Sequence, residues 1–195
     1  MNSKHIAPLI VAALLFSSCH NSDYTPLPQA YLRIDMPQPS YRLCDTADFP
    51  FSFEVSRYAS VCPKKHSPRD VWFDIVYPQW DAFIFLSYKH LSRPDDLRGQ
   101  TDTSLRLLES HYQFASGIDE QGYSDTDNKV FANVCRLNGS KVASTCQFWA
   151  TDSNRHFLRG ALYLDHTPNN DSLAPILHFV QADIDRLVES LRWRN

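Results

Sequence analysis

The sequence predicts a single antiparallel α+β domain. Three observations support this class: strand-like runs occur in two groups, a helical pattern follows each group, and the second helical pattern carries a long apolar stripe. Strands that are grouped, with helices between the groups, are typical of antiparallel α+β sandwiches. The chain has 195 residues, of which 43% are hydrophobic, so it contains enough apolar material for one core.

The first group of strands is expected between residues 51 and 88. Residues 51–55 alternate apolar and polar side chains, residues 71–76 do so less regularly, and residues 82–88 are rich in aromatic and β-branched types. Pro78 lies between the second and third runs and favours a turn there. We therefore predict three strands before the first helix.

The first helix is expected to begin at residues 92–95. Their sequence, Ser-Arg-Pro-Asp, is a start signal that puts proline in the first turn and an acid at the third helical position. Leu97, Leu105, Leu108 and Tyr112 then keep helical spacing. This pattern predicts a helix after the first group of strands.

The second group of strands begins at Lys129. Residues 130–137 and 140–149 flank Asn138-Gly139, and an Asn-Gly pair between two apolar runs indicates a β-hairpin with a two-residue turn. Residues 155–164 form a third strand-like run. We therefore predict a hairpin followed by one further strand.

The last helix has the strongest pattern in the chain. It follows a turn and cap at residues 169–172, and Pro175 lies in its first turn, where proline is tolerated. Its apolar residues form one continuous stripe: Leu173, Ile176, Leu177, Val180, Ile184, Leu187, Val188 and Leu191. The predicted order is thus strand-strand-strand-helix repeated twice, which is similar to the PsbP/Mog1-like sandwich.

The N-terminus has the plan of a secretory signal peptide. Residues 4–5 are basic, residues 6–16 are apolar, and two small serines lead to Cys19. The apolar stretch is shorter than the roughly 20 residues that span a bilayer. A cysteine at this place resembles a lipobox, so we predict a lipoprotein signal peptide at residues 1–18 and lipidation of Cys19. The alternative is ordinary cleavage near Ser18, which would leave a free cysteine.

The lipid determines where the protein is held. Stable anchoring takes two acyl chains or more, which a diacylglyceryl group on Cys19 and an acylated amine (palmitate-like chains) supply. His20 follows, where an aspartate would favour the inner membrane, so we expect the periplasmic face of the outer membrane. Five of the 12 prolines fall between residues 20 and 50. We predict an extended tether at residues 19–48, with a reach of about 90 Å, and one domain at residues 49–195.

Four cysteines remain after Cys19, an even number for an oxidising compartment. With the two-residue turn, position 135 faces 142 and position 146 faces 131, so Cys135 and Cys146 lie too far apart for a disulfide. A bridge between Cys44 and Cys62 stays open. The spacing of cysteines and histidines does not suit zinc, and we predict no metal and no cofactor.

The sequence offers no convincing catalytic constellation. His156 follows Asp152 and Ser153 closely, but a hydrolytic triad is defined by geometry in space, and a turn of capping residues explains the cluster better. Asp95 and Asp96 suit the start of a helix. The formal net charge of −3 does not favour nucleic acid. We therefore predict a protein that is not an enzyme and has no catalytic residues.

Two further sets of residues admit two interpretations each. The four tryptophans either pack in the core, which we favour, or line a ligand groove. The polar residues off the stripe of the last helix either face solvent or contact a partner. These residues are Trp72, Trp80, Trp149 and Trp193 in the first set, and His178, Asp185, Glu189 and Arg192 in the second.

Several segments, in order along the mature chain, resemble the GldD-type gliding motility lipoproteins. They are residues 21–26, 31–37, 86–89, 151–153, 156–163 and 171–175, followed by the terminal helix. The chain departs from that pattern at Phe49-Pro50, where the family has Cys-Pro, and at Phe16. The resemblance implies a non-enzymatic envelope lipoprotein that is required for gliding and for the linked type IX secretion system, as an assembly or stabilising subunit. Its partners would be the membrane and other gliding or secretion proteins. The alternative is a periplasmic lipoprotein that binds a small ligand or the cell wall.

Overall fold

The computed structural model describes residues 33–67 and 69–194. Cys19 and the expected signal peptide lie outside the described residues. The described elements are β1 (Tyr41–Cys44), β2 (Phe51–Ser56), β3 (Ser60–His66), β4 (Asp70–Tyr77), β5 (Ala82–His90), α2 (Pro94–Glu109), η2 (Tyr112–Phe114), β6 (Gly117–Asp125), β7 (Val130–Asn138), β8 (Cys146–Thr151), β9 (His156–Leu164), α3 (Asn170–Ser190) and β10 (Arg192–Trp193). The predicted mixture of antiparallel strands and two helices is confirmed.

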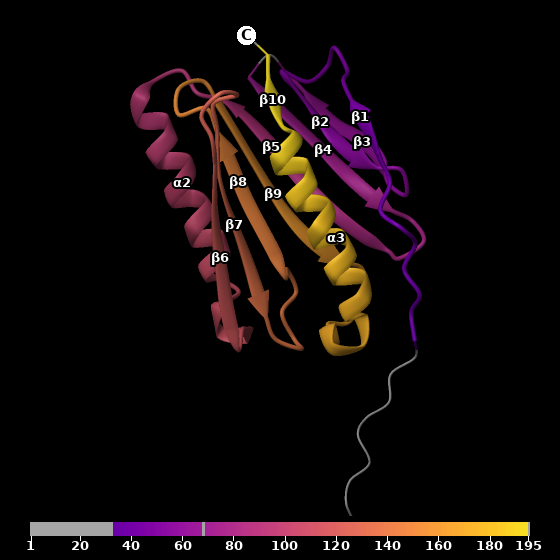
Figure 1. Ribbon diagram of the computed structural model, residues 1–195. Coiled ribbons are helices and arrows are strands. Elements are labelled where there is room, and N and C mark those ends of the chain that lie inside the picture. The colour runs from indigo at the N-terminus through magenta and orange to yellow at the C-terminus, as the bar shows by residue number, and fades with distance from the viewer. Residues whose placement is uncertain (1–32, 68, 195) are drawn as a thin grey trace, which may run out of the picture. The chain divides into compact units, whose positions relative to one another are not determined.

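A seven-stranded antiparallel sheet forms the centre of the domain, in the order β3-β4-β5-β9-β8-β7-β6. Figure 1 shows α2 on one face of this sheet and α3 on the other. A smaller sheet, β1-β2-β10, lies beside α3. The result is a layered α+β domain whose main core lies between the large sheet and α3.

Aromatic side chains fill the space between the two sheets. Phe51 and Phe53 of β2 are fully buried, and both rings lie 6.0 Å from the ring of Phe73 on β4. The ring of Phe49 lies 4.5 Å from that of Phe73. Alternation along β2 places these phenylalanines on one face, so the predicted strand at residues 51–55 supplies the contact between the sheets.

The apolar stripe of α3 is buried, as predicted. Ile176, Leu177, Val180, Ile184, Leu187 and Val188 all lie inside, together with Phe179 and Asp183. Burial of such a stripe removes large apolar areas from water and provides most of a helix's stability in a protein. The structure adds one buried carboxylate to this stripe, Asp183, that the periodicity did not indicate.

The predicted repeat of three strands and a helix is wrong. Five strands precede α2 and four lie between the helices, so the likeness to the PsbP/Mog1-like sandwich is not confirmed. The strands missed in the sequence are β1, β3, β6 and β10. β3 contains Pro63 at a register shift, and β6 is polar and almost wholly exposed. Both are edge strands, which tolerate proline and polar residues because one side has no partner strand.

The predicted two-residue hairpin turn at Asn138-Gly139 is also wrong. β8 begins only at Cys146, and Arg136 pairs with Cys146 across the ladder. Residues 139–145 form a loop whose carbonyls at Gly139 and Val142 accept hydrogen bonds from the Asn170 side chain, at 2.6 and 2.9 Å. The conformation of the loop between β7 and β8 therefore depends on a side chain of α3 that is more than 20 positions away in the sequence.

The four described cysteines are free thiols. Cys135 pairs with Gln147 while Cys146 pairs with Arg136, so the two cysteines point to opposite faces of the sheet. They cannot bridge, although the register used to predict this was wrong. Burial raises the pKa of Cys146 to about 12 and that of Cys135 to about 11, which makes both thiols unreactive. Cys44 and Cys62 lie in different sheets.

Part of the expected tether belongs to the folded domain. Residues 41–44 form β1, which pairs with β2, and Ile34 and Met36 pack against the core. The hydroxyl of Tyr58 donates a hydrogen bond to the carbonyl of Gln38 at 3.2 Å. The stretch that can extend freely is therefore shorter than the 90 Å estimate assumed.

Candidate functional site

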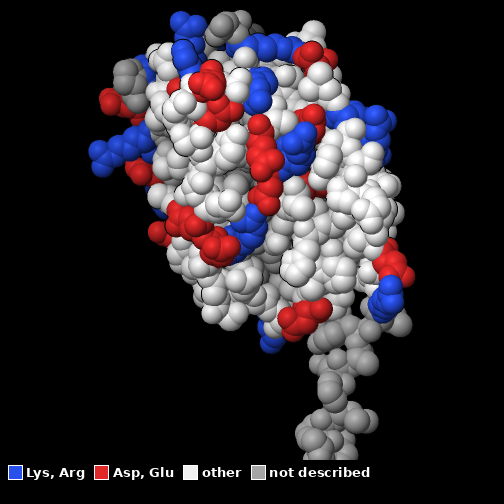
Figure 2. All heavy atoms as spheres, in the orientation of Figure 1, with Lys and Arg blue, Asp and Glu red and all other residues white. Residues whose placement is uncertain are grey.

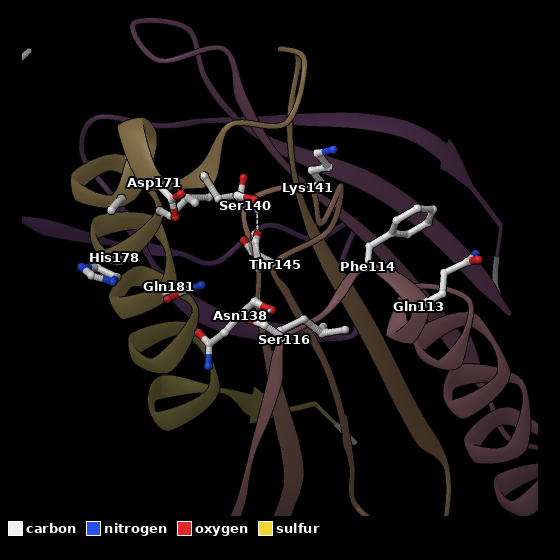
Figure 3. A pocket seen from close by; sticks show the side chains of 15 residues that line it. Gln113, Phe114, Ser116, Asn138, Ser140, Lys141, Thr145, Asp171, His178 and Gln181 are labelled. Carbon is white, nitrogen blue, oxygen red and sulfur yellow. Dashed lines mark hydrogen bonds between the residues drawn. The ribbon is translucent and has the colours of Figure 1, made fainter. Parts of the chain in front are cut away.

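An open groove of about 660 Å³ is hollowed into the described part of the chain. We call it the α3 groove. Its walls come from three places: η2 and the residues after it, the loop between β7 and β8, and the N-terminal half of α3. Figure 3 shows His178 and Gln181 of α3 across from Asn138 and Thr145. These segments lie far apart in the sequence, so only the fold brings them together.

Backbone and amide contacts hold the groove open. Besides the bonds of Asn170, the backbone nitrogen of Ser116 donates to the carbonyl of Asn138 at 2.7 Å. Gly139 has φ +146, and a Cβ there would lie 2.6 Å from the carbonyl oxygen of Phe114. Only glycine fits this conformation and this space. The glycine that suggested a hairpin is thus required by the wall of the groove.

The lining of the groove is mostly polar and uncharged. It presents amides and hydroxyls, with Lys141, Asp171 and His178 as its charged or titratable side chains. The Thr145 hydroxyl is buried and has no hydrogen-bond partner among the described residues. Such a lining suits polar ligand groups. Part of this lining is visible in the sequence as the polar run Gly-Ser-Lys at residues 139–141. We interpreted that run as part of a hairpin.

His156 lies at the opposite end of the domain, beside a second hollow of about 380 Å³ that His90, Arg155 and Arg194 also line. The Tyr88 hydroxyl lies 2.8 Å from Nδ1 of His156, and the Trp193 ring stacks on the imidazole at 5.0 Å. Strand pairing of β5 with β9 positions this pair.

The geometry around His156 is that of a structural histidine. Burial, with a smaller contribution from the charge of Asp152, raises the pKa of Tyr88 to about 12, so the phenol keeps its proton and forms its hydrogen bond with Nδ1 as an uncharged group. Burial lowers the pKa of His156, which favours the neutral ring. Oδ1 of Asp152 accepts three backbone N–H groups, from residues 154, 155 and 156. The predicted turn of capping residues is confirmed, and Asp152 acts on the backbone of the turn.

The tryptophans do not form a common groove. Trp80 packs on Phe179 at 5.0 Å, Trp149 stacks on Phe157 at 6.1 Å, and Trp193 stacks on His156. Trp72 is 45% exposed on β4. Neither the α3 groove nor the hollow beside His156 is lined by a tryptophan. For three of the four, packing within the domain is the better interpretation.

The polar residues off the stripe of α3 do not form one solvated face. Asp185 forms an ion pair with Arg136 of β7, and Nη1 of Arg192 lies 4.0 Å from Asp125. Glu189 lies 3.9 Å from Arg186 of the same helix, and His178 lines the α3 groove. Of these contacts, the ion pair of Asp185 with Arg136 attaches α3 to the large sheet. At the start of α2, Asp96 accepts the backbone N–H groups of residues 92 and 93. The predicted start signal put Asp95 at the third helical position, whereas in the structure Arg93 is the N-cap and Asp96 holds that position.

Two exposed apolar surfaces complete the candidate sites. The first, which we call the open sheet face, lies on β4, β5 and β9, beside the area that α2 covers. Phe85 is 40% exposed there, next to Phe83 and Tyr163, whose rings lie 6.0 and 5.4 Å away. The second surface surrounds η2.

Among the described residues, no group of three or more histidines, cysteines or acids is arranged to hold a metal.

Comparison with known proteins gives one strong result. A family model described as gliding motility lipoprotein GldD matches residues 21–193. The match includes nearly all of the described domain and the residues before it. A search of curated proteins found no significant match.

Proposed function

The chain belongs to the gliding motility lipoprotein GldD family, and from this premise we propose that it is an assembly or stabilising subunit of the gliding machinery and of the linked type IX secretion system. A lipoprotein family implies an anchor in a membrane of the cell envelope, and the family is not a known family of enzymes. None of the described helices is long and apolar enough to cross a membrane. We propose that lipid on Cys19 holds the domain at the periplasmic face of the outer membrane.

The open sheet face is the observation that supports a subunit role. The faces of antiparallel sheets in monomeric proteins are normally either packed or polar. Here the side of the large sheet that carries α2 leaves aromatic rings exposed beyond the helix, with Phe85 at 40% and Trp72 at 45%. Exposed aromatic residues gathered on one surface are typical of protein–protein interfaces.

The α3 groove supports the second candidate function, binding of a polar small molecule or of cell-wall glycan. Its amide and hydroxyl lining is suited to hydroxyl-rich ligands, and its volume of about 660 Å³ would admit one or two sugar rings. None of the four tryptophans that the sequence suggested for such a binder lines it. Titration of the protein with soluble peptidoglycan fragments, followed by NMR, tests this alternative directly.

Deletion of the gene with complementation tests the subunit role. Loss of the protein is expected to impair protein secretion and, in a motile host, gliding. Phe85→Asp on the open sheet face should fail to restore them at normal protein level. Leu43→Asp is the matched control, because Leu43 is 62% exposed on β1, outside this face. Full function in the Phe85→Asp strain would contradict a role for this face.

A His156 substitution separates this proposal from an enzymatic one. His156→Ala is expected to retain secretion and gliding wherever the protein reaches normal abundance, since the structure uses this side chain for packing and for the bond to Tyr88. Loss of function at normal abundance and normal melting temperature would favour a catalytic role for His156.

A further inference from the structure

Exposed apolar side chains are concentrated in one short segment. Of the eight large hydrophobic residues that are exposed among the described residues, five fall between positions 105 and 118. Four of them lie at the end of α2, in η2 and at the start of β6. We call these four the η2 patch: Leu107 (46% exposed), Tyr112 (39%), Phe114 (52%) and Ile118 (46%).

The core does not need these side chains. α2 packs on the sheet through Ser104 and Leu108, and Leu108 joins a small cluster with Cys135, Leu137 and Val142. Ile118 pairs with Leu137 on an edge strand, so its side chain has a neighbour on one side only. Polar side chains could occupy these exposed positions without any loss of core packing. The presence of apolar side chains there therefore indicates an external contact.

The η2 patch lies at the end of the domain where the described chain begins. Figure 1 shows the start of the described chain and η2 at the same, lower end, with β10 and the C-terminus at the other. Residues 20–32 separate Cys19 from Arg33. These 13 residues span at most about 45 Å when fully extended. A lipid on Cys19 would thus hold the start of the described chain within about 45 Å of the bilayer.

We infer that the η2 patch rests on the membrane to which the protein is anchored, with Tyr112, Phe114 and Ile118 in the lipid interface. Tyrosine favours this zone because its ring is apolar while its hydroxyl remains hydrated, and phenylalanine and isoleucine contribute apolar area that the lipid buries. The inference rests on the proposed lipid anchor and names the lipid surface as the partner of this end. The open sheet face then stays available to proteins.

Charge around the patch indicates the kind of lipid contact. Asp119 and Glu120 directly follow Ile118. Figure 2 shows the lower left end of the molecule, where Figure 1 places η2 and the start of β6, as largely uncharged, with acidic and basic side chains side by side above it. A surface of this kind is not attracted to anionic headgroups. Contact is therefore expected through apolar burial, on zwitterionic lipid, and is expected to persist at high salt.

Fluorescence quenching by brominated lipid tests the inference on the full mature protein. Phe114→Trp is purified from membranes, and mass spectrometry of its N-terminal peptide verifies the lipid. The protein is reconstituted into phosphatidylcholine vesicles with bromine near the top of the acyl chains, and the emission of the parent protein is subtracted. Phe85→Trp on the open sheet face is the matched control.

The expected result is loss of most of the added emission at position 114, little loss at position 85, and no change at 1 M salt. Ile118→Asp in the Phe114→Trp background should restore emission without altering the melting temperature. Equal emission at 114 and 85 in a lipid-carrying protein would overturn the inference and favour a protein partner for the patch, while the proposed function would stand. An N-terminal peptide without lipid would overturn the anchor, and with it this inference.

Discussion

The hydroxyl of Tyr77 donates a 2.9 Å hydrogen bond to Oδ2 of Asp183, which joins the central sheet to α3 inside the core. Both residues are buried, and Oδ1 of Asp183 has no hydrogen-bond partner among the described residues. Burial raises the pKa of Asp183, and the hydroxyls around it, that of Tyr77 first, partly oppose this. Burial and then the charge of Asp183 also raise the pKa of Tyr41 to about 12. The folded domain therefore favours the protonated form of this carboxyl group more than water does.

This environment gives the domain a defined pH dependence. Because the folded pKa of Asp183 lies above its ordinary value near 3.8, the folded state holds the proton more tightly than the unfolded state. Its contribution to stability is fully present below that ordinary value and is lost as pH rises through the folded pKa. Asp183→Asn keeps an acceptor for Tyr77 and should flatten the fall in stability above pH 4. Urea unfolding at several pH values, compared with the parent, measures this. An unchanged slope would contradict the assignment.

Gly160→Ala is expected to destabilise the domain by about 1–3 kcal/mol. A Cβ on this residue of β9 would lie 2.1 Å from the ring of Phe148 on β8, which is itself buried. Gly122→Ala on β6 is the control, since nothing lies within 4 Å of the added atom. Thermal or urea unfolding of both variants provides the comparison. A Gly160→Ala variant as stable as Gly122→Ala would show that the Phe148 ring can move aside.

Leu177→Asp should unfold the domain or prevent its accumulation. Leu177 is 6% exposed in the middle of the α3 stripe, and burying an unpaired carboxylate costs several kcal/mol, comparable with the total stability of a domain. Leu107→Asp places the same charge on an α2 leucine that is 46% exposed, and should melt near the parent. If Leu177→Asp melted within a degree or two of the parent, the packing of α3 described above would be in error.

Cys19→Ala is expected to stop lipidation and to leave a larger, unprocessed precursor. The reason is that the lipid is proposed to attach to this sulfur before the signal peptide is removed. Electrophoretic mobility, fractionation of membranes and mass spectrometry of the N-terminus measure the outcome. Ser18→Ala, which keeps a small residue beside the cysteine, serves as the control. Normal processing and membrane association of the Cys19→Ala protein would refute the lipoprotein prediction for this residue.

The sequence by itself determined the elements that bury a full face. The α3 stripe and the runs at β2, β4, β5, β7 and β9 were recognised because a buried face imposes a period of 3.6 or 2 on the apolar residues. The start of α2 was recognised from the Ser-Arg-Pro-Asp run at residues 92–95, because proline brings no free N–H group into the first turn and a nearby acid can accept backbone N–H groups. The structure gives the accepting role to Asp96. The family resemblance also followed from the sequence, since it depends on local segments in a fixed order.

Only the tertiary structure decided the edge strands, the β7–β8 connection and the sites. β3 and β6 lack a partner on one side, so their sequences carry no strong period, and residues 139–145 are held by Asn170 from another element. The burial of Asp183 depends on Tyr77, which is 106 positions away. The α3 groove likewise arises where segments distant in sequence meet at one end of the domain. Local periodicity reports whether a face is buried, whereas these features depend on which distant residue covers it.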